Sequence, residues 1–279
     1  MKVFYIGVFT AIAAFASIST AFSKDMAGES AYARVMRTRT LRCGYFIEAP
    51  ITQKNLQTGA LEGLVVDLTE SLAKDLGLKV EWAEEINAST MIEGLNTNRY
   101  DALCASIWNI TSRAGLMEHS IPYLYTPVGA YVRADDSRFD KGLSAVNEPG
   151  MIVAGVDGSG ETLLAAKAFP KAKQVTLPQF SSFPDLFLNV QSKKADMTFT
   201  NLPIFQDYQA KNPGKLKMAG LLTVMGNSFA FRQGETGLKN MFDTALMTYV
   251  DSGELDTIID KWEKSPHSFY RPEKPYRKN

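Results

Sequence analysis

The sequence predicts an α/β protein with two lobes, each a mainly parallel sheet with flanking helices, and two hinge crossings between the lobes. Segments typical of strands and helices alternate along residues 40–107 and again along residues 151–201, which is the pattern of parallel sheets with crossover helices. Two further strand-like runs, 128–136 and 226–234, bracket the second of these units. If the C-terminal helices pack back on the first unit, the chain crosses between the lobes twice and a cleft lies between them.

The first unit contains three strands and two helices. Leucines at four-residue spacing from Leu64 to Leu76, followed by Gly77, predict a helix that stops at a glycine. Ser89 and Thr90 precede the second helix as caps. The strands are predicted at residues 40–46, 78–82 and 100–107, and the helices at residues 63–77 and 91–98.

The second unit repeats this alternation, and two amphipathic helices follow it. Pro170 ends the first helix of the unit, whereas Ser182 caps the second and Pro184 lies in its first turn. The strands are predicted at residues 151–156, 173–178 and 195–201, the helices at residues 162–169 and 182–194, and the closing helix pair at residues 236–262. We therefore expect a first lobe of residues 40–130 and 228–264, a second lobe of residues 131–227 and a C-terminal tail of residues 265–279.

The composition is that of a soluble globular protein, since 45% of the 279 residues are apolar and 22% are charged. Thirty Lys and Arg residues balance 30 Asp and Glu residues, and neither sign forms a long block. This charge distribution is not typical of proteins that bind nucleic acid. We expect a small-molecule partner, no nucleic-acid partner and a monomer.

Residues 1–23 predict export as a signal peptide. Lys2 is followed by an apolar run, and small residues near Ala21 and Ser23 suit a signal peptidase. The run is also about as long as a membrane span, so an uncleaved anchor is the alternative. Both predict export, and we expect a periplasmic protein.

Cysteine and histidine are scarce. Cys43 and Cys104 lie in predicted strands, and either a disulfide between neighbouring strands or two buried free thiols suits this placement. The only histidines are His119 and His267, and neither has another metal-ligating residue at a suitable spacing. We expect no metal, no cofactor and no His-based catalytic triad.

Four segments resemble the bacterial extracellular solute-binding proteins of family 3, which deliver polar amino acids to ABC importers. They are residues 59–82, 95–123, 155–162 and 249–262. The resemblance covers about residues 40–264. It implies a type II periplasmic-binding-protein fold, a small carboxylate-bearing ligand and an ABC permease of the inner membrane as partner, and it implies no enzymatic activity.

The resemblance assigns Arg113 as the clamp for the α-carboxylate of the ligand, because the family has an arginine twelve residues after the aspartate that corresponds to Asp101. A guanidinium suits this task, since its planar donors meet a carboxylate in two parallel hydrogen bonds. Polar residues also make the turn upstream of Arg113 open to the cleft. The candidate ligand contacts in this turn are Ser106, Ile107, Trp108 and Asn109.

In the second lobe, the glycine-rich residues 157–161 connect a predicted strand to a helix. Backbone N–H groups at a helix start favour an anion. The resemblance implies that Ser159 and Gly160 hold the carboxylate there, and a plain tight turn is the alternative.

Two positions depart from the family pattern. Asn201 stands where the family usually has an aspartate that pairs with the ligand's α-amino group, and Ile110 replaces a threonine. An amide accepts a hydrogen bond from an ammonium group without neutralising it. The sequence therefore suggests a ligand without a free α-ammonium group, unless an acid such as Glu48 compensates.

Tyr45 and Phe46 follow the first strand, where the family places an aromatic that stacks on the ligand, and Glu48 lies close behind. Burial in the core for the aromatics and a solvated position for Glu48 are the alternatives.

Two other functions compete with transport. Some proteins of this resemblance are dehydratases of the cyclohexadienyl dehydratase type, for which Glu48, Glu161 and His119 are the candidate acids or bases. A soluble sensor that docks on a signalling receptor is the other alternative.

Overall fold

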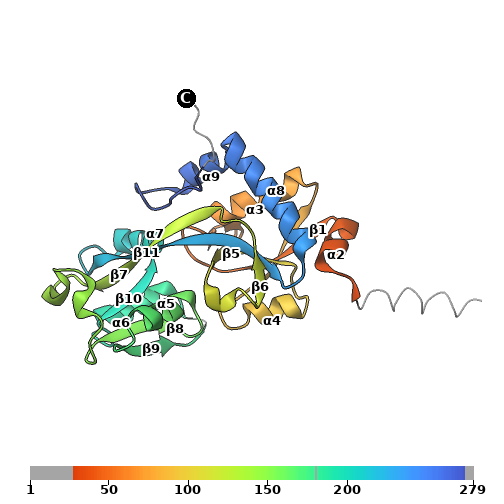
Figure 1. The fold of residues 1–279 in the computed structure, drawn as a ribbon. Helices are drawn as coiled ribbons and strands as arrows, with labels where there is room; N and C mark the ends of the chain where they lie inside the picture. The colour runs from red at the N-terminus through yellow and green to blue at the C-terminus, as the bar shows by residue number, and fades with distance from the viewer. Residues whose placement is uncertain (1–27, 180, 274–279) are drawn as a thin grey trace, which may run out of the picture.

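The computed structural model describes residues 28–179 and 181–273, and it has the expected two-lobed α/β fold (Figure 1). The expected signal peptide, residues 1–23, lies outside the described residues. Strands β1, β5 and β6 belong to one lobe, and β8, β9 and β10 belong to the other. The longest strand, β11, runs through both lobes.

One sheet continues through both lobes in the order β4-β1-β5-β11-β7-β10-β8-β9, and β6 also pairs with β11. Its strands are β1 (Thr40–Tyr45), β4 (Lys79–Glu85), β5 (Ala102–Trp108), β6 (Met117–His119), β7 (Leu124–Arg133), β8 (Ile152–Val156), β9 (Lys173–Leu177), β10 (Met197–Asn201) and β11 (Leu216–Arg232). The pairs β1–β4, β1–β5, β8–β9 and β8–β10 are parallel, as the alternation of strands and helices predicts. The strands that cross between the lobes, β7 and β11, pair antiparallel.

Strands β7 and β11 form the two hinge crossings. Residues 216–227 of β11 pair with β7, and residues 227–231 of the same strand pair with β5 of the first lobe. The prediction placed a strand at 226–234 and missed the first half of β11. We propose that the lobes meet near residues 130 and 227, because both positions lie within these shared strands.

Helices cover the sheet of each lobe. They are α2 (Ala31–Thr38), α3 (Leu64–Asp75), α4 (Met91–Asn96), α5 (Gly160–Ala168), α6 (Phe183–Gln191), α7 (Leu202–Lys211), α8 (Thr236–Ser252) and α9 (Glu254–Trp262). In the first lobe, α3 contacts both C-terminal helices. The return of α8 and α9 to this lobe makes the two crossings a hinge, as the sequence predicts (Figure 1).

The caps of two predicted helices behave differently. Ser182 forms the expected cap of α6, where its backbone N–H donates to the Asp185 carboxylate over 2.8 Å. Thr90 precedes α4, but its side chain makes no capping hydrogen bond. Asn87 acts in that turn instead, because its Oδ1 accepts from the backbone N–H groups of Ser89 and Thr90, each at 3.1 Å.

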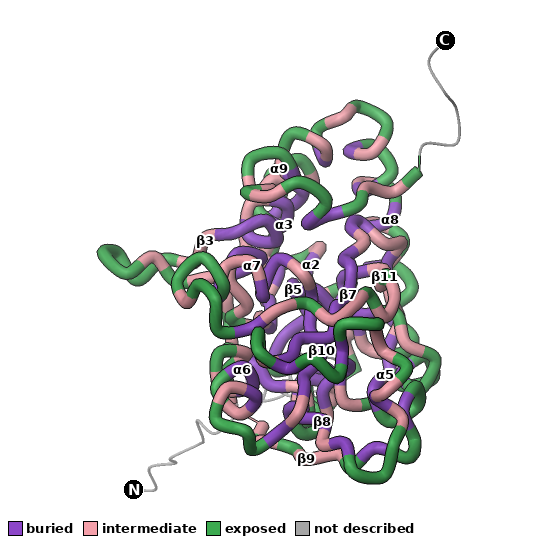
Figure 2. The backbone as a smooth tube through the Cα atoms, turned by 90° about the vertical axis from the view of Figure 1, so that its left-hand side faces the viewer, coloured by how far each residue is buried: buried purple, intermediate pink, exposed green. Residues whose placement is uncertain are grey.

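Each lobe has its own core. Leu72 of α3 packs in one cluster with Phe229 of β11 and Phe242 of α8, whereas Phe169 and Phe199 belong to a cluster of the second lobe. Buried stretches follow the strands through both lobes, and exposed stretches lie in loops at the periphery (Figure 2). The burial therefore separates two packed units that are joined by the hinge strands.

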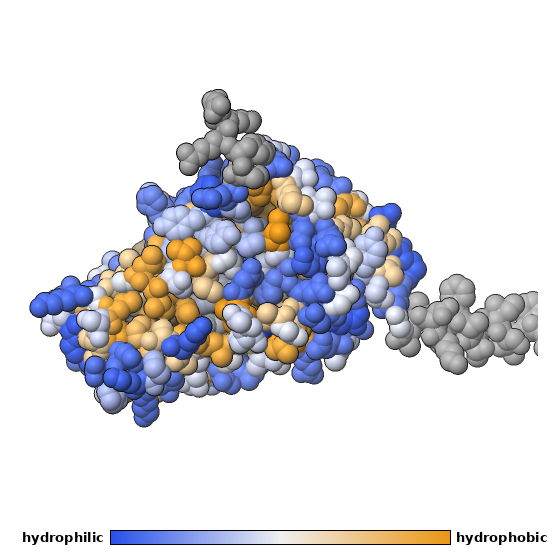
Figure 3. Space-filling view, viewed as in Figure 1, coloured by the Kyte–Doolittle hydropathy of each residue, from blue (hydrophilic) through white to orange (hydrophobic). Residues whose placement is uncertain are grey.

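The outer surface of the second lobe is partly apolar. Apolar side chains gather over that lobe in Figure 3. Residues 216–226 of β11 pair only with β7 within the described chain, and Met218, Leu221 and Val224 on this stretch are 41–50% exposed. This half of β11 is thus an edge strand with one face on solvent.

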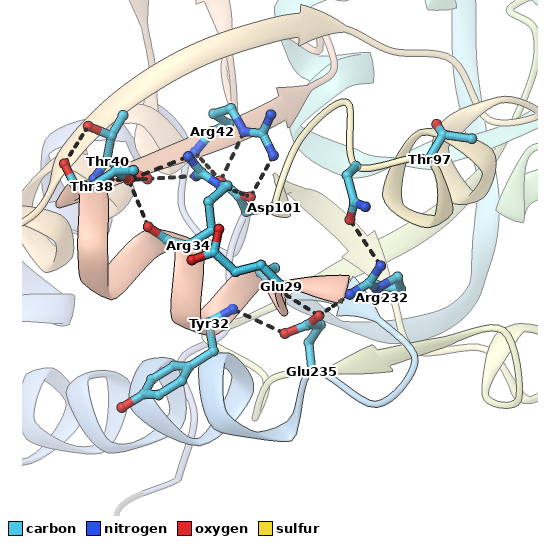
Figure 4. Close-up of polar contacts among 12 residues, drawn as sticks. Glu29, Tyr32, Arg34, Thr38, Thr40, Arg42, Thr97, Asp101, Arg232 and Glu235 are labelled. Carbon is cyan, nitrogen blue, oxygen red and sulfur yellow. Dashed lines mark hydrogen bonds and ion pairs between the residues drawn. The ribbon is translucent and has the colours of Figure 1, made fainter. Parts of the chain in front are cut away.

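An ion-pair cluster attaches the N-terminal helix α2 to the first lobe (Figure 4). Asp101 is 2% exposed and accepts hydrogen bonds from the guanidinium groups of Arg34 and Arg42 and from the backbone N–H of Arg42. Glu235 accepts from the backbone N–H groups of Ala31 and Tyr32 at the start of the same helix. These contacts fix α2, which was not predicted, against β1 and the start of α8.

Cys43 and Cys104 form a disulfide with an S–S distance of 2.00 Å. The sequence left this pairing open. The bond joins β1 to β5, which are hydrogen-bonded neighbours, so both cysteines lie in the core of the first lobe. Among the described residues, no helix is long and apolar enough to span a membrane.

Candidate functional site

A pocket of about 270 Å³ lies between the two lobes. In the first lobe its lining residues are 46–48, 85–88, 106–108 and Arg113, and in the second lobe they are Val156, 159–161, Gln179, 181–183 and Asn201. Several of these segments follow the carboxyl ends of the strands β1, β4, β8, β9 and β10. Open α/β sheets bind ligands at this end of the strands. The volume suits a small metabolite.

Most of the predicted site residues line this pocket, and two do not. Tyr45 lies one residue before the lining segment, and its ring packs edge-on against Trp82 with 5.8 Å between the ring centroids. Asn109 is exposed, and its Oδ1 accepts a 2.6 Å hydrogen bond from the Ser228 hydroxyl. We leave both residues out of the proposed site.

Arg113 supplies the positive charge of the pocket. It ends a short 3-10 turn, Thr111–Arg113, and is 8% exposed. Its Nη2 donates to the backbone oxygen of Gly158 over 2.7 Å, so this side chain reaches across the pocket to the second lobe. Burial lowers the pKa of Arg113, and the carboxyl group of Glu161 opposes that shift. Its other N–H groups have no hydrogen-bond partner within the described chain and are available to an anion.

Trp108 and Gly160 touch across the cleft. Trp108 ends β5 in the first lobe and packs in an apolar cluster made mostly of second-lobe residues. A Cβ atom on Gly160 would lie 3.0 Å from the indole, which is closer than an ordinary van der Waals contact. Trp108 therefore both lines the pocket and serves as a contact between the lobes.

The start of α5 carries an acidic residue beside the expected anion site. Ser159 caps the helix, and its hydroxyl accepts from the backbone N–H of Thr162 over 3.2 Å. The carboxyl group of Glu161 lies at this end of the helix, where the backbone N–H of Glu161 and the Ser159 hydroxyl oppose the rise in its pKa that burial causes. That Ser159 and Gly160 hold a ligand carboxylate stays a prediction, and Glu161 places an acid beside them in the pocket lining.

Two carboxyl groups from opposite lobes face the pocket. Burial, reinforced by the negative charge of Glu161, raises the pKa of Glu48 to about 8. Burial also raises the pKa of Glu161, although its hydrogen bonds and Arg113 act against this. Glu85 lines the pocket as well, but the ammonium group of Lys54 pairs with it at 2.6 Å. The pocket is therefore suited to a cationic group beside Glu48 and Glu161.

Asn201 ends β10 and lines the pocket with only 2% of its surface exposed. Its Oδ1 accepts a 2.7 Å hydrogen bond from the Thr126 hydroxyl. The sequence treated this amide as a possible acceptor for an ammonium group, and Thr126 occupies one of the two acceptor positions of the amide oxygen.

Several lining residues were missed or given another role. Glu161 was considered only as a catalytic acid, and Asn87, Gln179 and Phe183 were not considered as site residues. Asn87 and Gln179 follow the strands β4 and β9, so the rule that sites gather beyond the carboxyl ends of strands would have found them. His119, the third candidate acid, is not among the lining residues, and its Nδ1 lies 2.8 Å from the Ser228 hydroxyl.

Comparison with known proteins gives consistent results. Residues 41–265 match the family model of bacterial extracellular solute-binding proteins, family 3. The chain is 22% identical over 222 residues to the glutamine-binding protein of an ABC transporter from Bacillus subtilis, covering 76% of each chain. It is 24% identical over 212 residues to the arginine-binding periplasmic protein of Mannheimia haemolytica, covering 74% of this chain and 84% of the relative.

A solved structure shows the same fold. The ancestral amino acid-binding protein AncCDT-1, described as a precursor of cyclohexadienyl dehydratase, superposes with a TM-score of 0.73 at 28% identity. The match covers 84% of this chain and all of the ancestral protein. The relatives described by these comparisons are binding proteins for amino acids.

Proposed function

Because the chain belongs to the bacterial extracellular solute-binding proteins, family 3, we propose that it captures an amino acid or a close derivative in the periplasm and delivers it to an ABC importer. The observation that carries this proposal is the buried guanidinium of Arg113, which faces the pocket between the lobes with unused donors. A carboxylate is the natural partner for it. The names of the relatives, which bind glutamine and arginine, support an amino-acid ligand.

The proposed cycle is a hinge motion. Ligand carboxylate binds Arg113, and the lobes close through the contacts of Arg113 with Gly158 and of Trp108 with Gly160. A ligand that contacts both lobes favours the closed state by its differential affinity. The closed monomer, with residues 1–23 removed as a signal peptide, then presents the solute to the inner-membrane permease.

A dehydratase is the second candidate. It is favoured by the raised pKa of Glu48, because a carboxyl group that stays protonated near neutral pH is suited to general acid catalysis. Incubation of the mature protein with prephenate tests it, with loss of prephenate as the readout. Turnover that disappears in both Glu48→Gln and Glu161→Gln would favour the enzyme.

Arg113→Ala tests the binding proposal. Thermal shift with the twenty standard amino acids identifies those that stabilise the mature protein, since a ligand that binds only the folded state raises its Tm. Isothermal titration of the strongest then compares wild type and variant. We expect Arg113→Ala to weaken binding by about thirtyfold to several-thousandfold, because removing one partner of a buried charge pair costs about 2–5 kcal/mol.

The matched control is Arg37→Ala, since Arg37 pairs with Glu29 on the exposed face of α2 and does not line the pocket. This variant is expected to bind like wild type. Equal affinity of Arg113→Ala and wild type, with both variants folded by circular dichroism, contradicts the proposal for Arg113. No thermal shift with any amino acid contradicts the proposed function itself.

A further inference from the structure

We infer that the pocket selects a basic amino acid, whose carboxylate meets the donors of Arg113 and Asn201 and whose cationic groups meet Glu48 and Glu161. The inference rests on the proposed function and names its solute class. Two independent observations carry it. One is the direction of the hydrogen bonds that orient Asn201, and the other is the charge of the pocket.

A buried chain of hydrogen bonds fixes the orientation of the Asn201 amide. Nδ2 of Asn227 donates to the backbone oxygen of Met225 over 2.9 Å, and a carbonyl only accepts, so this end of the Asn227 amide is its NH₂ group. The same nitrogen lies 3.0 Å from the Thr126 hydroxyl and must donate to it. Oδ1 of Asn227 accepts from Ser106, which agrees with this orientation.

The Thr126 hydroxyl accepts from Asn227 and donates its hydrogen to Asn201. A hydroxyl carries a single hydrogen, and the Thr126 oxygen lies 2.7 Å from Oδ1 of Asn201. Asn201 consequently accepts on the Thr126 side and turns its NH₂ group the other way. That NH₂ group has no hydrogen-bond partner within residues 28–179 and 181–273, and Asn201 lines the pocket. Position 201 thus offers a donor for a ligand oxygen, while Thr126 occupies one of the two acceptor positions of its amide oxygen.

The acids of the pocket favour a cationic solute. Among the ionisable lining residues, Glu85 is already paired with Lys54, which leaves Arg113 against Glu48 and Glu161. Burial favours the protonated forms of Glu48 and Glu161 in the ligand-free protein, and a cation bound beside them favours the ionised forms. With both carboxyl groups ionised, these three side chains sum to one negative charge. The complementary solute has one carboxylate and two cationic groups, which is the charge pattern of a basic amino acid. Its cations relieve the repulsion that closure imposes on two carboxylates from opposite lobes.

The test uses L-arginine with two matched probes. Agmatine retains the guanidinium and an amine but lacks the carboxylate, and L-citrulline retains the shape but lacks the side-chain charge. Titration calorimetry gives the Kd of each probe for wild type. The agmatine-to-arginine Kd ratio tests recognition of the carboxylate, and the citrulline-to-arginine Kd ratio tests recognition of the side-chain cation. We expect agmatine to bind at least about a hundredfold, and L-citrulline at least about tenfold, more weakly than L-arginine.

Asn201→Asp tests the donor. A carboxylate at this position attracts the cations of L-arginine and agmatine alike but repels only the carboxylate of L-arginine. The agmatine-to-arginine Kd ratio is therefore expected to fall by at least about tenfold. Thr126→Val releases the Asn201 amide to rotate and is expected to lower the agmatine-to-arginine Kd ratio by a smaller factor. It is the substitute test if Asn201→Asp does not fold. Asn240→Asp, on the exposed surface of α8, controls for the added charge and is expected to leave the ratio unchanged.

Glu161→Gln, with Glu48→Gln as its second variant, tests the acid pair. Either change is expected to bring the Kd values of L-citrulline and L-arginine within about threefold of each other. The probes change if L-lysine gives the largest thermal shift. Cadaverine, which lacks the carboxylate, then replaces agmatine, and L-norleucine, which lacks the side-chain charge, replaces L-citrulline. An unchanged or larger agmatine ratio in Asn201→Asp, or binding of neutral amino acids alone, overturns this inference while the proposed function stands. Binding of no amino acid overturns both.

Discussion

Glu48 holds its carboxyl group in a pocket where burial and the nearby Glu161 raise its pKa to about 8. A proton bound this tightly stabilises the folded state fully below the unfolded pKa of 4.5, and the stabilisation is lost as the pH rises through about 8. Glu48→Gln removes the titration. Between pH 5 and pH 9, the free energy of unfolding of ligand-free wild type should therefore fall further than that of ligand-free Glu48→Gln, and we expect the difference to be about 1–3 kcal/mol. The difference is smaller than the full pKa shift implies because water reaches the pocket.

Urea unfolding of both proteins at the two pH values measures this difference. Glu81→Gln is the control, because Glu81 is an exposed residue of β4 that does not line the pocket. Parallel pH dependence of wild type and Glu48→Gln would show that the Glu48 carboxyl group is solvated like any surface acid.

The sequence predicted which residues line the pocket better than it predicted how their side chains are oriented. Arg113, Trp108 and Asn201 were placed in the site from spacing and resemblance, and all three line the pocket. The direction of the Asn201 amide was not predictable, because it is set by Thr126 and Asn227, which are 75 and 26 residues away in the chain. Glu161 was hard to assign for a similar reason, since its partner Glu48 lies in the other lobe.

Strands β1 and β5 are joined by the Cys43–Cys104 disulfide, which closes a loop with a sequence separation of 61 residues. In the chain-entropy account, a crosslink of this span removes about 4 kcal/mol of conformational freedom from the unfolded chain. We expect the double variant Cys43→Ser, Cys104→Ser to lose about 3–4 kcal/mol in free energy of unfolding, measured in urea. Wild type with reductant is the matched control, and a double variant as stable as oxidised wild type would contradict the prediction.

At the scale of elements, strong local signals predicted the fold and weak ones failed. The leucine spacing of α3, the capping signal of α6 and the apolar run of β8 each specify an element without help from the rest of the chain. Helix α7 was not predicted, although Pro203 lies in its first turn, where proline is tolerated, as Pro184 does in α6. The first half of β11 was missed because its strand character depends on pairing with β7.

The whole molecule is held in its present form by contacts across the pocket. Arg113 donates to Gly158 of the second lobe, and a Cβ atom on Gly158 would lie 3.6 Å from Ser89 of the first. Beyond the hinge, the Ser268 hydroxyl of the C-terminal segment donates to Gln206 of α7 over 2.6 Å. These contacts are small compared with the two lobe cores, as expected of a surface that must open to admit a solute.

Gly160→Ala tests whether closure depends on the fit of α5 against Trp108. The added methyl group would lie 3.0 Å from the indole, which is 4% exposed and packed among second-lobe residues, so the closed form is strained while the open form is not. We expect the variant to bind its best amino acid about three- to thirtyfold more weakly, an overpacking cost of about 1–2 kcal/mol, with unchanged ligand-free stability. Small-angle scattering should show a smaller decrease in radius of gyration on ligand addition than in wild type.

Gly150→Ala is the control, since nothing lies within 4 Å of a Cβ atom there. If Gly160→Ala binds and closes like wild type, the indole yields to the methyl group, and the contact between Trp108 and Gly160 does not control closure.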